Sequence, residues 1–307
     1  MADLFDPEII STLKGLEVRS QRLVASHMMG MHKSSLRGIS TEFAQHRQYV
    51  VGDDTRHVDW KVYAKTDEVF IKEYEAETNM AVYFMIDMSP SMFYKSEGTP
   101  MSKFEYAATI VATLCYMMQQ QKDLFGLCLF DANIQKFMKP KGSNLHYRNM
   151  ISVLEDELNK EIDPSDDRKT DIGNTIKKLG PQVKSKGIVV VISDFVDDIE
   201  KLGLGLGQIS FLGQDSILFH IEDPVERDFP FAGQTIFRGL EGEGKLLCDP
   251  RDLRSIYLEK KAEHLDKLQD ICVKFGYDFR RIQTDTRLDV VLSEFMSTRM
   301  SQRRRRR

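Results

Sequence analysis

The stretch Ala81-Val-Tyr-Phe-Met-Ile-Asp-Met-Ser-Pro-Ser91 decides the fold, because a continuous apolar run ends there in an acid and two hydroxyl side chains. An apolar run without polar alternation is typical of a strand buried on both faces of a parallel sheet. Asp87, Ser89 and Ser91 follow this run directly. In a doubly wound sheet the carboxyl ends of the strands form the ligand crevice, so these three residues are placed where ligands bind.

Short apolar strands and amphipathic helices alternate along the rest of the chain. The helix that follows the first strand begins with the capping-box pattern of Ser102 and Glu105. The strands 124–130 and 134–138 are separated by the polar turn Asp131-Ala-Asn133, which indicates an antiparallel hairpin. Further strands are expected at 187–194, 216–221 and 277–283. The pattern predicts a Rossmann-like α/β fold, a doubly wound, mostly parallel sheet with one antiparallel edge strand.

Helices are expected at about 145–160, 171–184 and 198–211, and a long helix from Asp249 and Pro250 to about residue 275. The third of these carries Gly203, Gly205 and Gly207 without the spacing of a dinucleotide-binding loop. We interpret these glycines as a loosely packed helix surface.

Three segments are predicted from these patterns. Residues 1–78 form an N-terminal extension with a helix near 7–28 and an edge strand near 69–76. Residues 79–298 form the α/β domain, with a hairpin insertion at about 230–248. Residues 299–307 are rich in arginine and are expected to be a disordered tail, because like charges repel one another.

Composition excludes several classes of protein. Of 307 residues, 41% are hydrophobic and 29% are charged, as in a globular protein. The net charge is −4, and the arginines at 303–307 carry +5, which leaves −9 for the rest and argues against specific nucleic-acid binding. The longest apolar run has about 12 residues, where a membrane span needs roughly 20. The acidic N-terminus is unlike a secretory signal, so we expect a cytoplasmic protein without a membrane span.

Two further features sharpen the motif at residue 87. Thr170 opens a predicted helix, and Asp194 ends the second buried strand. The five residues offer hard oxygen ligands from three loops, which suit Mg²⁺ or Mn²⁺: Asp87, Ser89, Ser91, Thr170 and Asp194. The alternative is structural, with the hydroxyls capping helices and the aspartates lying at helix N-termini.

The five positions resemble the metal-ion-dependent adhesion site of von Willebrand factor A domains, whose pattern is Asp-x-Ser-x-Ser, then a distant Thr, then Asp. The resemblance implies that Ser89, Ser91 and Thr170 reach the metal directly or nearly so. It also implies that Asp87 and Asp194 act mainly through water. A sixth position would accept a carboxylate from a partner protein.

The segment Tyr49-Val-Val-Gly-Asp-Asp-Thr-Arg-His-Val-Asp-Trp60 resembles the signature of a bacterial family called domain of unknown function 58. Such proteins carry a von Willebrand factor A-like domain and are typically encoded beside MoxR-type AAA+ ATPases. The resemblance therefore implies an adaptor or co-chaperone that works with such an ATPase or its client.

Four charged residues and one tryptophan are dense in this segment: Asp53, Asp54, Arg56, Asp59 and Trp60. The first interpretation is a paired structural network that Trp60 anchors to the core. The alternatives are a docking surface for the ATPase and a second shell around the metal.

Two functions are weighed. The first is a non-enzymatic, metal-dependent protein-interaction module whose partner supplies an acidic residue. The alternative is a metal-assisted hydrolase, such as a phosphatase with Asp87 as its nucleophile. Such enzymes usually need a second Asp two positions on as general acid, and Ser89 stands there. The sequence therefore favours the interaction module.

Overall fold

The computed structural model describes residues 5–31, 43–49, 58–66, 68–74, 81–160, 170–183, 186–239 and 244–305. Two compact units are present, one formed by Met1–Met28 with Met80–Arg307 and the other by Met29–Asn79. The second unit is inserted in sequence between the N-terminal helices and the first strand of the main sheet. The predicted boundary at residue 78 is therefore wrong for the N-terminal helices.

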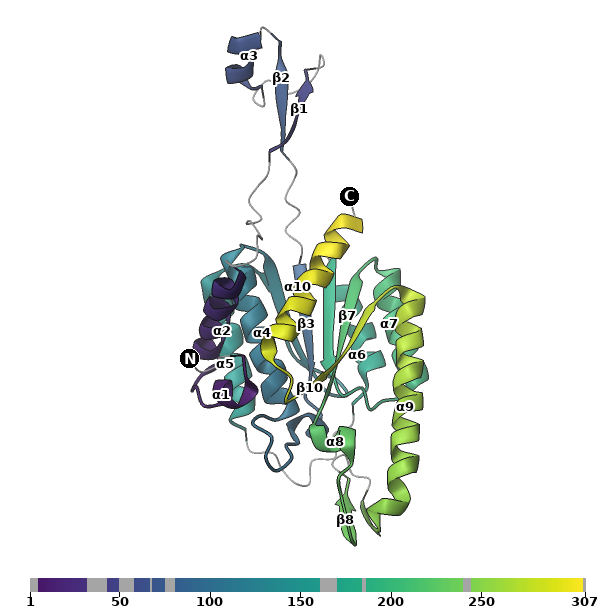
Figure 1. The fold of residues 1–307 in the computed structure, drawn as a ribbon. Coiled ribbons are helices and arrows are strands. Elements are labelled where there is room, and N and C mark those ends of the chain that lie inside the picture. The colour runs from purple at the N-terminus through teal and green to yellow at the C-terminus, as the bar shows by residue number, and fades with distance from the viewer. Residues whose placement is uncertain are drawn as a thin grey trace. The chain divides into compact units, whose positions relative to one another are not determined.

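The first unit is built on a six-stranded sheet with the order β10-β7-β6-β3-β4-β5 (Figure 1). Neighbouring strands are parallel except β4 and β5, which are antiparallel. This is the doubly wound, mostly parallel sheet with one antiparallel edge strand that the sequence predicts. Its strands are β3 (Ala81–Asp87), β4 (Leu124–Phe130), β5 (Ile134–Lys141), β6 (Gly187–Ser193), β7 (Asp215–Glu222) and β10 (Asp278–Gln283).

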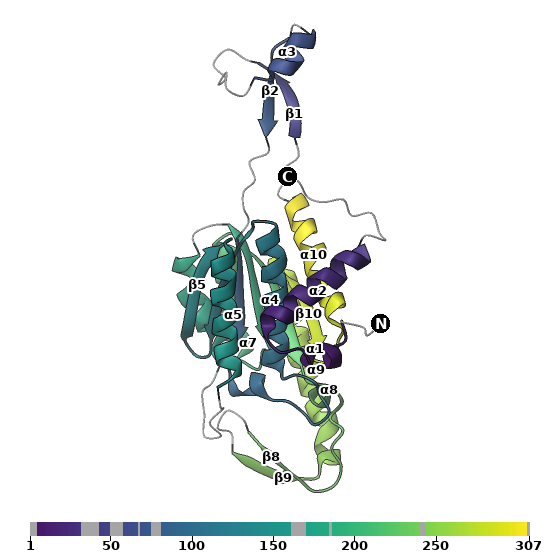
Figure 2. The same ribbon diagram turned by 90° about the vertical axis from the view of Figure 1, so that its left-hand side faces the viewer.

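Helices cover both faces of this sheet, as Figures 1 and 2 show from two sides. Side chains alternate between the faces, so Phe84 and Ile86 of β3 join one apolar cluster while Tyr83 and Met85 join the other. The first cluster is covered by α1 (Pro7–Ser11), α2 (Leu16–Met31), α4 (Lys103–Gln120), α5 (Asn144–Leu158) and α10 (Leu288–Arg305). The second is covered by α6 (Ile172–Leu179), α7 (Ile199–Phe211) and α9 (Pro250–Phe275).

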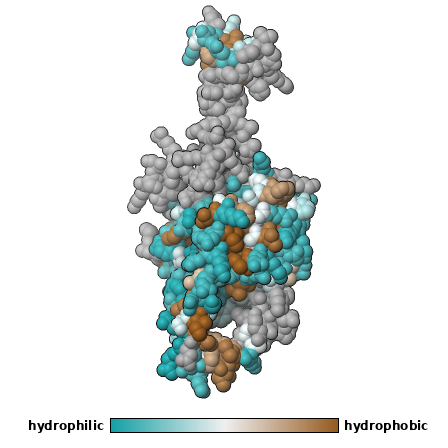
Figure 3. Space-filling view, turned by 90° about the vertical axis from the view of Figure 1, so that its right-hand side faces the viewer, coloured by the Kyte–Doolittle hydropathy of each residue, from teal (hydrophilic) through white to brown (hydrophobic). Residues whose placement is uncertain are grey.

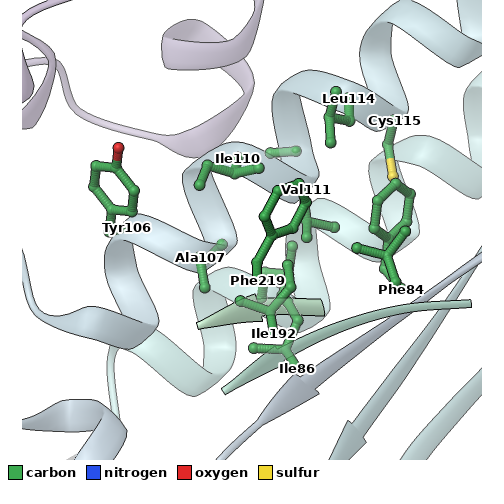
Figure 4. Packing of buried hydrophobic residues seen from close by; sticks show 14 of the residues in the cluster. Phe84, Ile86, Tyr106, Ala107, Ile110, Val111, Leu114, Cys115, Ile192 and Phe219 are labelled. Atoms are coloured by element: carbon green, nitrogen blue, oxygen red, sulfur yellow. The ribbon is translucent and has the colours of Figure 1, made fainter. Parts of the chain in front are cut away.

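Helix α4 packs its apolar side directly on the strands (Figure 4). Ala107, Ile110 and Val111 of α4 and the strand residues Phe84 and Ile86 are all fully buried. Ser102 begins the helix by accepting a hydrogen bond from the backbone N–H of Glu105, as its capping pattern predicts. This packing fixes the start of α4, which lies near the carboxyl edge of the sheet.

The N-terminal helices belong to the same core. Ile10, Leu16 and Leu23 of α1 and α2 are buried in the first cluster, and Arg19 pairs with Glu105 of α4 at 2.7 Å. The predicted disorder over residues 299–305 is also wrong, since α10 continues to Arg305. Arginine, methionine and glutamine are good helix formers, so a helix already anchored by Leu292 and Phe295 extends through them.

The hairpin insertion forms as predicted, with β8 (Thr235–Arg238) antiparallel to β9 (Lys245–Cys248). It follows the short helix α8 (Pro224–Asp228) and precedes α9, which Asp249 caps. Ile236, Leu246 and Leu247 of the hairpin are exposed. In the view onto the α9 side, this part of the molecule shows hydrophobic surface below a mostly hydrophilic face (Figure 3).

The inserted unit contains β1 (Phe43–Gln48), β2 (Phe70–Tyr74) and the helix α3 (Trp60–Thr66). The two strands pair with each other in an antiparallel sheet of their own, with Val58 bridged to Ile71. The strand expected near residues 69–76 therefore exists, but its partner is β1.

Candidate metal centre

The five predicted ligands lie together at the carboxyl edge of the main sheet. Asp87 is the last residue of β3, Asp194 follows β6, and Thr170 stands two residues before α6. Ser89 and Ser91 lie at the start of a single 3₁₀ turn, Pro90–Phe93. The adjacency of β3 and β6 in the sheet brings the two aspartates to the same place.

Asp87 is the centre of this cluster and is fully buried. Its Oδ1 accepts a hydrogen bond from the backbone N–H of Ser89 at 2.8 Å, and its Oδ2 accepts one from Ser193 Oγ at 2.6 Å. Thr170 Oγ1 lies 3.4 Å from Oδ1 and 3.5 Å from Oδ2. The Oγ atoms of Ser89 and Ser91 are 3.0 Å apart. The hydroxyls of Ser193 and Thr170 thus contact the Asp87 carboxylate.

Asp194 carries a contact that the sequence did not predict. Its Oδ2 accepts from Nζ of Lys103 at 2.9 Å, and the same ammonium donates to Oε1 of Glu226 at 2.6 Å. Lys103 is the first residue of α4 and is only 1% exposed. Glu226 belongs to α8, so this lysine joins α4, the β6 end and α8.

Burial and neighbouring charges shift the pKa values of Asp87, Asp194 and Lys103. Burial and then the negative charge of Asp194 raise the pKa of Asp87 to about 7. Burial alone would raise the pKa of Asp194 too, but the charge and hydrogen bond of Lys103 outweigh it and lower that pKa. Burial would lower the pKa of Lys103, but the negative charges of Asp194 and Glu226 outweigh it and raise that pKa. Lys103 is therefore a charged ammonium.

The donor set fits a hard divalent cation. Two buried carboxylates repel each other across the cluster, and a dication placed among them would relieve that repulsion. Hydroxyl and carboxylate oxygens are the ligands that Mg²⁺ and Mn²⁺ prefer. Within the described ranges, no group of three or more His, Cys, Asp or Glu side chains forms a metal site, so this set depends on Ser89, Ser91 and Thr170.

The loop that carries Thr170 is held by two aspartate side chains that accept hydrogen bonds from backbone N–H groups. Asp171 caps α6 by accepting from the N–H of Asn174 at 2.8 Å, and Oδ2 of Asp197 accepts from the N–H of Ile172 at 2.9 Å. Asp197 comes from the loop after β6. Its carboxylate therefore ties the Thr170 loop to the loop that carries Asp194.

Close packing of α6 on α7 holds the same loop. A Cβ on Gly173 would lie 2.2 Å from the carbonyl oxygen of Lys201, and one on Gly205 would lie 2.7 Å from Cα of Gly173. Only glycines allow this approach. The interpretation of Gly205 as part of a loosely packed surface is therefore wrong.

The signature segment lies in the inserted unit. Asp53, Asp54 and Arg56 fall outside the described residues. Asp59 is buried, donates its N–H to Phe70 O at 2.8 Å and accepts from Val62 N at 3.4 Å, as a cap of α3. Trp60 is 64% exposed and packs edge-on against Tyr63. Trp60 is therefore not buried within the inserted unit itself.

Sequence reasoning missed Ser193, Lys103, Glu226 and Asp197. Ser193 and Asp197 stand beside Asp194 in the sequence, so the end of the second buried strand was a signal for both. Lys103 and Glu226 are separated by 123 residues, and nothing local marks them as partners.

No helix among the described residues has the length and apolar character that a membrane crossing needs.

Comparisons with known proteins agree with the family resemblance. The chain is 22% identical over 240 residues to the uncharacterized proteins Mb1516 of Mycobacterium bovis and Rv1480 of Mycobacterium tuberculosis, covering 78% of this chain and 73% of theirs. Among solved structures, BatB from Bacteroides thetaiotaomicron is 17% identical with a TM-score of 0.44, covering 71% of this chain and 98% of BatB. The SpRpn10 VWA domain is 12% identical with a TM-score of 0.41, covering 70% and 94%. The family described as protein of unknown function DUF58 matches residues 45–267, most of the sequence, and the chain belongs to this family.

Proposed function

We propose that this protein is a non-enzymatic interaction module that binds one Mg²⁺ or Mn²⁺ and uses it to hold an acidic side chain of a partner protein. The observation that carries the proposal is the convergence of Asp87, Ser89, Ser91, Thr170 and Asp194 on one sheet edge, with Thr170 Oγ1 3.4 Å from Asp87. Such a cluster is more than helix capping requires, because Asp87 and Thr170 cap no described helix.

Each residue has a part in this proposal. The hydroxyls of Ser89, Ser91 and Thr170 would hold the cation, with Asp87 and Asp194 orienting its waters. When bound, the cation supplies an electrophilic position for one external carboxylate. Ser193 keeps Asp87 in place by its 2.6 Å hydrogen bond.

We further propose that the partner is a MoxR-type AAA+ ATPase or a client of that ATPase. What supports this partner is the family resemblance, because proteins of this family are typically encoded beside such ATPases. The chain would then act as an adaptor or co-chaperone, presenting its metal edge to an acidic residue of the ATPase or the client.

The hydrolase alternative has less support. Asp87 stands where an aspartyl nucleophile would stand, but the position of the general acid is Ser89, whose hydroxyl pairs with Ser91 at 3.0 Å. Asp194 is paired with Lys103 at 2.9 Å, which keeps it ionised and unsuited to donate a proton.

Calorimetric titration of Mg²⁺ and Mn²⁺ tests the proposal. The native protein is expected to bind one cation, and a double variant with Asp87→Ala and Ser89→Ala is expected to bind none. Asp266→Ala is a matched control, because Asp266 is an exposed carboxylate of α9. A pull-down of the ATPase should succeed with Mg²⁺ and fail with chelator.

Two results would oppose the proposal. Partner binding that is equal with and without chelator would show that the metal is not used. Turnover of a phosphate monoester by the native protein, abolished by Asp87→Asn, would favour the hydrolase.

A further inference from the structure

Lys103 lies where a lysine is doubly unfavourable. It is the first residue of α4, at the positive end of the helix dipole, and its side chain is 1% exposed. Burial of an ammonium costs several kcal/mol, and apolar residues in place of a buried ion pair are often equally stable or more stable. Folding alone therefore gives little reason for a charge at this position.

Two acids from different elements of the fold bind the ammonium of Lys103. Asp194 after β6 accepts at 2.9 Å, and Glu226 of α8 accepts at 2.6 Å. Glu226 is itself fixed, because its Oε2 accepts from the N–H of Asp223 at 2.9 Å. The carbonyl of Glu226 also accepts from the side chains of Tyr257 at 3.2 Å and Lys261 at 2.9 Å. The position of Lys103 is thus set by the surrounding fold.

This lysine changes the charge of the candidate metal site. When all three carboxyls are ionised, Asp87, Asp194 and Glu226 together with the ammonium of Lys103 carry a net charge of −2. Without Lys103 the net charge would be −3. A less negative site binds a dication more weakly, and the bound cation keeps more of its attraction for an external carboxylate.

We propose that Lys103 is a positioning residue that tunes the cation site: it holds one oxygen of Asp194, lowers the affinity for the cation and leaves the bound cation reactive towards a partner's carboxylate. Glu226 opposes this effect by neutralising Lys103. The inference rests on the proposed metal-binding function and adds its regulation by a residue outside the five-residue pattern.

A set of charge variants tests this inference with Mn²⁺ alone. Lys103→Met makes the local charge more negative, Glu226→Gln makes it less negative, and the double variant restores the native net charge. We expect Lys103→Met to bind Mn²⁺ about tenfold more tightly and Glu226→Gln about tenfold more weakly, with the double variant within about threefold of native. Free Mn²⁺ is counted by electron paramagnetic resonance, with folding checked by circular dichroism.

The surface pair Lys260 and Glu263 of α9 gives a matched control. Their side chains are 69% and 46% exposed and lie 2.8 Å apart. Solvent and salt screen such a pair, so Lys260→Met and Glu263→Gln are expected to change the Mn²⁺ affinity by less than about twofold.

The outcomes separate this inference from the metal-binding proposal. If the native protein binds Mn²⁺ but the affinities of the variants do not follow their local charge, the proposed role of Lys103 is wrong and the metal-binding proposal stands. If the native protein and all variants bind no Mn²⁺, both are wrong. Lys103→Met removes the ammonium from the buried Asp194 and the partly exposed Glu226. If that variant fails to fold, the affinities of the native protein, the double variant and Glu226→Gln still decide.

Discussion

Thr170 Oγ1 lies 3.4 Å from Oδ1 of Asp87, although 83 residues separate them in the sequence. The fold brings them together from the start of α6 and the end of β3. Asp197 and the close contact of Gly173 with Gly205 hold the loop that carries Thr170. The geometry of the candidate metal site therefore depends on residues that would not touch the metal.

Asp197→Ala is expected to weaken Mn²⁺ binding about fivefold without removing any predicted ligand. Its Oδ2 accepts from the N–H of Ile172 at 2.9 Å, and a hydrogen bond to a charged group contributes about 1.5 kcal/mol or more. The control is Asp198→Ala, since Asp198 caps α7 and is exposed. That control should lose the stability that its helix cap contributes and keep the affinity. Equal affinities in both variants would contradict the role given to Asp197.

Gly205→Ala is expected to destabilise the protein by about 1–3 kcal/mol, because the new Cβ would lie 2.7 Å from Cα of Gly173. Gly203→Ala is the matched control on the same helix. Its Cβ would lie 3.3 Å from the flexible end of Ile271, and alanine is the better helix former. Urea unfolding measures both. A Gly205→Ala protein as stable as Gly203→Ala would show that the two helices can separate freely.

Asp87→Asn is expected to abolish Mg²⁺ binding and to raise the melting temperature of the metal-free protein. The amide keeps the size of the side chain and removes the repulsion between two buried carboxylates, Asp87 and Asp194. Thermal unfolding with and without 5 mM Mg²⁺, a concentration on the order of ten times a weak site's Kd of about 0.5 mM, checks both effects. Stabilisation of the variant by Mg²⁺ as large as that of the native protein would place the cation elsewhere.

The buried His220 of β7 is expected to make the stability of the protein depend on pH. Burial lowers its pKa from 6.5 to about 4, and its Nδ1 has no hydrogen-bond partner among the described residues. Acids at Glu222 and Asp194 act in the opposite direction, and Lys261 and Lys103 act with burial. In the unfolded chain this histidine gains a proton near pH 6.5, whereas in the folded protein it does so only near pH 4. The free energy of unfolding is therefore highest above pH 6.5 and falls as the pH falls towards 4.

The size of this effect follows from linkage. Between pH 7.5 and pH 5, His220 should account for a loss of about 2 kcal/mol in the free energy of unfolding. His220→Phe preserves the ring packing between Phe195 and Phe279 and should flatten the acid side of the profile. Urea unfolding at the two pH values measures the difference. Parallel profiles for native protein and variant would assign the acid sensitivity to other groups.

Much of the fold could be predicted, because buried parallel strands are continuous apolar runs and helix caps are local. The strand 81–87 and the helix that Ser102 caps follow from a few neighbouring residues. The edge that gathers Asp87 and Asp194 follows from the same reasoning, since both acids end adjacent strands.

The rest depends on contacts between distant residues. Burial of Lys103 needs both Asp194 and Glu226, and no local pattern announces that pairing. Gly205 looks like a weak helix residue until Gly173 is known to pack on it. The same holds for α2, whose Leu23 packs in one core with the strands that follow the inserted unit in the sequence.

A crystal grown with Mn²⁺ tests the central claim most directly, through the anomalous scattering of manganese. We predict one strong anomalous peak at the carboxyl edge of the sheet, within about 2.5 Å of the hydroxyl oxygens of Ser89, Ser91 and Thr170. A structure at saturating Mn²⁺ without a peak there, or with its peak among other residues, would contradict the account.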